Sequence, residues 1–160
     1  MKPSNLGIPF IKQAQRNRFP SLFVDTVLEL VPGESCRVKK NFTYNEWFFP
    51  THFPEEPIVP GYVLLEAMTQ ALLIAGLGQT EYEGSRTAFV KVSSCEFKKA
   101  VIPGDSLISE AQVTSFRRGI LNGAVIALVE DTVACRTELV LAVPDAMPKI
   151  QPRTSEAEDD

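Results

Sequence analysis

The sequence has one histidine and only three cysteines among its 160 residues. The cysteines (Cys36, Cys95 and Cys135) lie far apart and lack the CxxC spacing of zinc sites and redox motifs. A single histidine excludes a histidine-rich metal site. We therefore expect reduced thiols, a cytoplasmic location and no bound metal.

An excess of positive charge is also missing, and so are the common cofactor motifs. The net charge is -4, and the four acids in residues 154–160 account for it, because residues 1–153 hold 16 acids and 16 bases. This balance speaks against a nucleic-acid-binding face. The chain has no P-loop, no dinucleotide fingerprint and no GxSxG motif, so we expect no cofactor and no serine hydrolase.

No apolar run is long enough for a membrane span. The longest, from Tyr62 to Leu77, makes a helix of about 24 Å at ~1.5 Å per residue, whereas a hydrocarbon core needs ~30 Å. It also contains Glu66 and Gln70. We expect a buried helix, no membrane insertion and, since the chain does not open on a basic and then apolar segment, no signal peptide.

The order of the predicted elements indicates an α+β fold. A short helix is expected in "IKQAQRNRFP", two strands joined at Pro32-Gly33 in residues 21–43, a helix over 61–78, and about four antiparallel strands after it. A helix that is apolar almost all round must be covered almost all round, so we expect a curved sheet wrapped around it. Residues 1–143 should form one domain, and the proline-containing acidic tail, 144–160, should be disordered.

Three residues between positions 52 and 66 are candidates for catalysis. His52 lies between prolines that stiffen its backbone, and its imidazole suits acid–base chemistry, although a lone histidine is more often a surface or core residue. Glu66 lies in the apolar helix, where burial would raise its pKa and Gln70, at i+4, could hold it; it could instead point to solvent. Gly61 opens the helix, where free N–H groups can stabilise an oxyanion, or it is a plain turn glycine.

The segment "HFPEEPIVPGYVLLEAMTQA" resembles the HFPxxPxxPGxxxxEAxxQ signature of the 3-hydroxyacyl-acyl-carrier-protein dehydratases of type II fatty-acid synthesis. "NRFPSLFVDTV", "FKKAVIPGD" and "RRGILNGAVIALVED" resemble further family segments, so the likeness covers roughly residues 10–142. It implies a hotdog fold, in which a curved antiparallel sheet surrounds a long central helix.

The resemblance also implies an activity, a hydro-lyase acting on 3-hydroxyacyl-ACP in fatty-acid, polyketide or polyene synthesis without a cofactor. His52 would be the base, Glu66 of the partner subunit the acid, and the Gly61 N–H the donor to the thioester carbonyl. The implied partners are acyl carrier protein and a second copy of the chain, as a homodimer or a hexamer of three dimers. The residues expected to contact substrate are Phe53, Pro60, Tyr62, Gln70 and Phe89.

The chain departs from the family pattern at four positions. Thr51 stands where a glycine is usual, Ala88 and Lys91 where a gating aromatic and a glycine often stand, and Asn17 where a histidine is frequent. No proton-transfer group is lost. Two alternatives remain open: acyl-CoA hydrolysis or hydration on the same fold, and a non-catalytic subunit that binds acyl carrier protein or completes a heteromer.

Overall fold

A computed structural model of the chain describes residues 5–149. Its elements lie in the predicted order, and the long helix ends within one residue of the predicted limit. They are α1 (Ile8–Ala14), β1 (Thr26–Val31), β2 (Ser35–Asn41), the 3-10 helix η1 (Phe49–Thr51), α2 (Gly61–Leu77), β3 (Ala88–Phe97), β4 (Ser106–Arg117), β5 (Ile120–Val129), β6 (Thr132–Ala142) and the 3-10 helix η2 (Pro144–Ala146).

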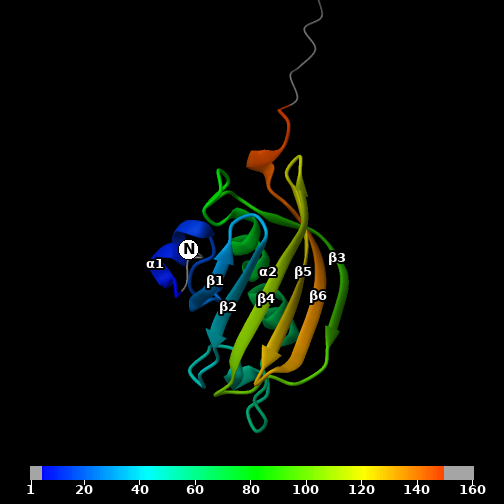
Figure 1. The fold of residues 1–160 in the computed structure, drawn as a ribbon. Coiled ribbons are helices and arrows are strands. Elements are labelled where there is room, and N and C mark those ends of the chain that lie inside the picture. The colour runs from blue at the N-terminus through cyan, green and yellow to red at the C-terminus, as the bar shows by residue number, and fades with distance from the viewer. Residues whose placement is uncertain (1–4, 150–160) are drawn as a thin grey trace, which may run out of the picture.

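The six strands form one antiparallel sheet that curves around α2. Their order is β1-β2-β4-β5-β6-β3, and Figure 1 shows α2 lying against one face of this sheet. Thirteen of the 17 residues of α2 are buried, which is what a helix without a polar face requires. The predicted α+β architecture, a curved sheet around a central apolar helix, is confirmed as a hotdog fold.

The two edges of the sheet differ. At β1, Leu6 and Val27 exchange two backbone hydrogen bonds, of 2.9 and 2.8 Å, and α1 lies beside the strand (Figure 1). At β3, nine of ten residues are exposed. Among them are four large apolar side chains, with exposed fractions of 48% for Phe89, 57% for Val90, 40% for Val92 and 54% for Phe97. The edge formed by β3 is open.

Secondary structure continues past residue 143, the predicted end of the domain. Pro144–Ala146 form η2, and Asp145 accepts a hydrogen bond of 3.2 Å from the Arg86 N–H. This short helix lies at the end of the sheet where β6 ends (Figure 1). The rest of the predicted tail, 150–160, lies outside the described residues. No helix in residues 5–149 is long and apolar enough to cross a membrane.

Candidate active site

Glu66 is half-buried on α2, and two amide groups hold one oxygen of its carboxyl group. Asn17 Nδ2 donates to Oε1 at 2.8 Å, and Gln70 Nε2 donates to the same atom at 2.9 Å. Burial raises the pKa of Glu66, and the hydrogen bonds from Gln70 and Asn17 lower it in part. The net shift is upward, which favours a carboxyl group that keeps its proton at higher pH than an exposed glutamate does.

Two hollows meet at this carboxyl group. One, of about 490 Å³, is lined by Asn17, Ser21, Phe23, Trp47, Tyr62, Leu65, Glu66 and Phe89. A smaller one, of about 190 Å³, is lined by Asn17, Glu66, Thr69, Leu73, Thr87, Ala88, Phe89 and Leu141. Both contain Phe89 of the open strand β3. Apart from Glu66, neither lining includes a side chain that is charged near neutral pH, so an apolar ligand chain could lie against the acid.

His52 is positioned by η1 and by the loop that follows it. Phe48 and Phe49 are almost fully buried and anchor η1, while the Thr51 hydroxyl donates to the Phe48 carbonyl at 3.0 Å. The threonine therefore fits this turn without a positive φ. The His52 N–H donates to the carbonyl of Phe49 at 3.3 Å. Together these contacts fix the backbone from which the imidazole projects.

One ring nitrogen of His52 is already engaged. Nδ1 lies 3.2 Å from the carbonyl oxygen of Ile58, and the Phe53 ring stacks on the imidazole with centroids 4.5 Å apart. Because a carbonyl oxygen only accepts, this contact places the proton on Nδ1 and leaves a lone pair on Nε2. Nε2 is then the nitrogen available to take up a proton.

Gly61 begins α2 directly after Pro60, and the backbone there is tightly packed. A Cβ on Gly61 would lie 3.0 Å from Cζ of Phe97, so only glycine fits without moving that ring. Among the described residues, the N–H groups of Gly61 and Tyr62 donate to no backbone carbonyl. A helix start with free N–H groups can bind a polarised carbonyl oxygen.

A family model described as "FabA-like domain" matches residues 16–138, most of the chain. The chain belongs to the FabA-like family. Curated relatives named 3-hydroxyacyl-[acyl-carrier-protein] dehydratase FabZ include that of Listeria welshimeri, 39% identical over 144 residues, which cover 90% of this chain and 99% of that protein. The FabZ of Bacillus cereus is 40% identical over 140 residues, with 88% and 97% covered.

Solved structures extend the likeness to more distant proteins with the same fold. The dehydratase heterocomplex ApeI:P from Xenorhabdus doucetiae superposes with a TM-score of 0.72 at 14% identity, covering 84% of this chain and 90% of that one. An uncharacterized protein, PH1136, from Pyrococcus horikoshii superposes with a TM-score of 0.63 at 16% identity, covering 82% and 91%. At these identities the likeness concerns the fold.

Within this FabA-like chain, the predicted site residues fall into two groups. Glu66, Tyr62 and Phe89 line the larger hollow. His52 and Phe53 lie together on the loop after η1, and neither lines either of the two hollows at Glu66. Neither of these two hollows therefore brings together His52 and Glu66, the two candidate proton-transfer groups, within one copy of the chain.

Pro60 and Gln70 do not line these hollows, although both were expected to contact substrate. Pro60 is buried and its carbonyl accepts the N–H groups of Val63 and Leu64, so it starts the helix. Gln70 is fully buried behind Glu66 and uses its amide to hold that carboxyl group, as the i+4 spacing suggested.

Sequence reasoning missed the roles of Asn17 and Trp47. Asn17 was noted only as a departure from the family pattern, yet it reaches Glu66 across 49 residues of sequence. Trp47, the one tryptophan, lines the larger hollow with 48% of its surface exposed. Its only sequence signal was its rarity.

Proposed function

We propose that this chain dehydrates 3-hydroxyacyl-acyl-carrier-protein thioesters to trans-2-enoyl thioesters in the cytoplasm, during fatty-acid synthesis or a related polyketide or polyene pathway. The observation that carries the proposal is Glu66, a carboxyl group with a raised pKa at an apolar hollow. The identity of about 40% to curated FabZ dehydratases supports the same reaction.

In the proposed reaction, the substrate loses one proton to His52 and its hydroxyl group gains one proton from Glu66. Nε2 of His52 removes a proton from C2, and the electron pair left behind forms the C2–C3 double bond. The C3–O bond breaks, and the hydroxyl group leaves as water with the proton of Glu66. The Gly61 N–H donates to the thioester oxygen, where negative charge develops as the C2 proton leaves. Transfer of the proton from His52 back to Glu66 through solvent restores the starting state.

We further propose that each site is shared by two copies of the chain, with Glu66 from one copy and His52 of the partner subunit. Two observations support this arrangement. Within one copy, His52 is absent from the linings of both hollows described at Glu66. The hollows at Glu66 instead include Phe89 of β3, whose edge is open and apolar. A second β3 strand paired with this edge would bury the apolar side chains and close the hollows.

The first experiment measures turnover directly. Purified protein is given 3-hydroxybutyryl-ACP, and loss of water from the acyl group is followed by mass spectrometry beside His52→Ala and Glu66→Gln. We expect each variant to lose about a hundredfold or more in kcat, since each removes a proton-transfer group. Wild-type turnover no higher than that of the variants would instead favour a non-catalytic subunit. The same assay with acyl-CoA distinguishes the carriers.

A mixing experiment tests whether the site is shared. His52→Ala and Glu66→Gln chains are unfolded together, refolded and assayed against each variant refolded alone. Random pairing makes about half of the dimers mixed, and each holds one intact site of two, so about a quarter of wild-type activity should return. No recovery would mean that each site uses residues of one chain. Sedimentation of the wild type distinguishes a dimer from a hexamer of three dimers.

A further inference from the structure

The two oxygens of the Glu66 carboxyl group differ in their hydrogen bonds. Oε1 accepts from both Asn17 and Gln70, whereas no described residue donates to Oε2. A protonated carboxyl group carries its proton on one oxygen only, and an oxygen that already accepts two N–H groups is the poorer place for it. The unequal hydrogen bonding therefore favours Oε2 over Oε1 as the oxygen that carries the proton.

The orientation of the Gln70 amide follows from its own neighbours. Its Oε1 accepts the backbone N–H of Phe23 at 2.9 Å, so this end of the amide must be the oxygen. Its Nε2 donates to the Ser21 carbonyl at 2.7 Å and to Glu66 at 2.9 Å. Both N–H groups are used, and the group facing Glu66 can only donate. The Gln70 amide therefore donates one of the two hydrogen bonds that Oε1 of Glu66 accepts.

Asn17 is held in place by contacts of the chain that follows α1. Its backbone N–H donates to Oε1 of the buried Gln15 at 2.6 Å, and its carbonyl accepts from Arg18 Nη1 at 2.8 Å. The Arg18 guanidinium also binds the carbonyls of Gln15 and Lys12, at 2.9 and 2.7 Å. This segment brings the Asn17 side chain to Glu66 from outside α2.

Resting on the proposed function of Glu66, we propose that Asn17 is a positioning residue that, together with Gln70, holds Oε1 so that Oε2 carries the proton given to the leaving hydroxyl group. Asn17 does not transfer a proton itself. Because its amide does not titrate, it keeps this arrangement unchanged across the neutral pH range.

Few other ionisable groups face the carboxyl group of Glu66. Tyr62 is the other titratable side chain in the linings of the two hollows. Arg16 and Arg18, next to Asn17, direct their guanidinium groups at backbone carbonyls. Lys91 of β3 lines neither hollow. Within one copy, a pH effect of a change at Asn17 can therefore be assigned to Glu66. The partner's His52, which the proposed function places in the same site, is distinguished from Glu66 by an NMR titration of Glu66 itself.

The test compares Asn17→Leu, which removes the donor at similar size, with Asn17→His, whose ring N–H restores one. We expect Asn17→Leu to lower kcat about tenfold with little change in KM, and Asn17→His to recover most of it. Losing a donor to the ionised carboxylate raises the pKa of Glu66 further, so the alkaline limb of the pH–rate profile should move to higher pH. Asn122→Leu is the matched control, because Asn122 is also half-buried and donates one hydrogen bond, 3.0 Å to Ser115 Oγ, outside both hollows.

A second measurement does not depend on turnover. NMR of 13C-carboxyl-labelled glutamate follows the titration of Glu66, whose signal is identified by its loss in Glu66→Gln. Its midpoint should move to higher pH in Asn17→Leu and stay unchanged in Asn122→Leu. If Asn17→Leu does not fold, Asn17→Ser is measured in the same way.

The outcomes separate the two proposals. A lower kcat with an unmoved alkaline limb and an unmoved NMR midpoint would show a merely structural role and overturn the inference, as would an unchanged kcat. An inactive wild type would overturn the proposed function alone, and the NMR midpoint would then decide whether Asn17 controls the protonation of Glu66.

Discussion

At one edge of the sheet, β1 is covered within its own chain by Leu6 and α1, whereas at the other edge β3 leaves nine of its ten residues exposed. Both edges offer unpaired backbone groups in principle, and native proteins rarely leave such an edge long and apolar. The chain completes the first edge itself. The second edge borders the hollows at Glu66, because Phe89 of β3 lines both of them. The unpaired edge of the sheet therefore lies next to the proposed site.

The largest effect should come from placing charge on the open edge. Val90→Lys with Val92→Lys would add like charges from both copies to a β3–β3 pair, where they repel. We expect monomers in sedimentation and a loss of about a hundredfold or more in kcat, because the partner's His52 is removed from the site. Ile126→Lys, on β5 with 43% exposure, is the control for an added surface lysine. A monomeric double variant with full activity would contradict the shared site.

A smaller effect should follow from Gly61→Ala, which tests the contact between β3 and α2. The new Cβ would lie 3.0 Å from Phe97 Cζ, and we expect a cost of about 1–3 kcal/mol in the free energy of unfolding, together with a lower kcat. Gly7→Ala is the control, since its Cβ would meet only Pro9 Cδ, at 3.9 Å. Urea unfolding measures both. Adding Phe97→Leu should restore part of the loss, and no such coupling would mean that the ring contact is unimportant.

The closed edge should respond differently to mutation. Leu6→Ala removes a partly buried side chain beside β1 and should cost about 1–2 kcal/mol in the free energy of unfolding. Because this edge faces no partner in the proposal, the sedimentation coefficient and kcat should stay as in the wild type. A change of oligomeric state in this variant would show that both edges, and not β3 alone, take part in assembly.

The smallest expected effect is a pH dependence of stability that comes from Glu66. A raised pKa means that the folded chain binds this proton more tightly than the unfolded chain does. The stabilisation is therefore present below the ordinary pKa of glutamate and is lost as the pH rises through the raised value. Thermal unfolding of the wild type and Glu66→Gln between about pH 4 and pH 8 measures this, and the difference should increasingly favour Glu66→Gln at higher pH. Parallel curves would contradict a half-buried carboxyl group that holds its proton more tightly in the folded chain.

The elements of this fold were predictable because their signals are local. Pro60 and the apolar run after it mark the start and length of α2, and Pro32-Gly33 marks the hairpin between β1 and β2. The position of β3 beside β6 rather than β4 was not predictable, since strand order depends on contacts far apart in the sequence.

Within the candidate site, the residues were easier to predict than their contacts. The residue types and surroundings of His52, Gly61 and Glu66 made them candidates, and the resemblance of their segment to the dehydratase signature implied the chemistry. The i+4 position of Gln70 pointed to its hydrogen bond with Glu66. The partner of Glu66 from outside the helix, Asn17, had no local signal. Neither did the packing of Phe97 on Gly61, because each of these pairs is brought together only by the complete fold.

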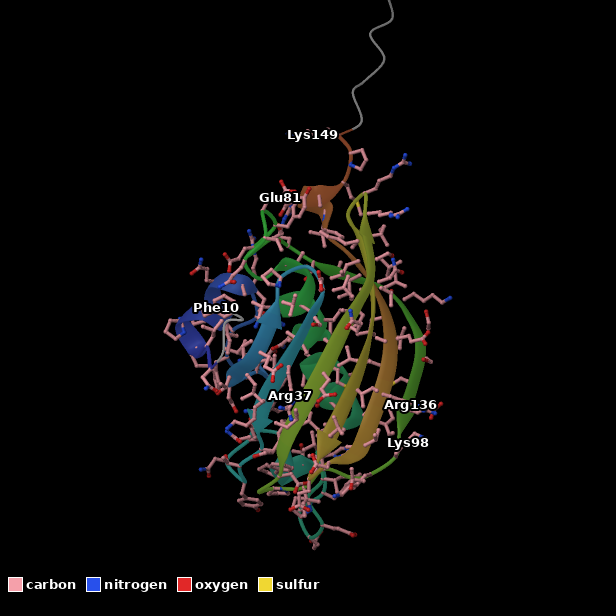
Figure 2. All side chains as sticks on the ribbon, in the orientation of Figure 1. Phe10, Arg37, Glu81, Lys98, Arg136 and Lys149 are labelled. Carbon is pink, nitrogen blue, oxygen red and sulfur yellow. The ribbon has the colours of Figure 1, made fainter. Side chains whose placement is uncertain are left out.

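The open edge of β3 has a consequence for how activity depends on the concentration of the chain. Phe97 of this strand lies against Gly61, and the neighbouring Glu96 forms exposed ion pairs with Lys98 and Arg136, of 3.1 and 2.7 Å. Figure 2 shows Lys98 and Arg136 at the lower end of the sheet. If pairing of β3 completes the site, subunit concentration and catalytic capacity are no longer proportional. Below the dissociation constant of the dimer, the number of complete sites rises with the square of the chain concentration. A cell that halved its supply of this chain in that range would then keep about a quarter of its turnover.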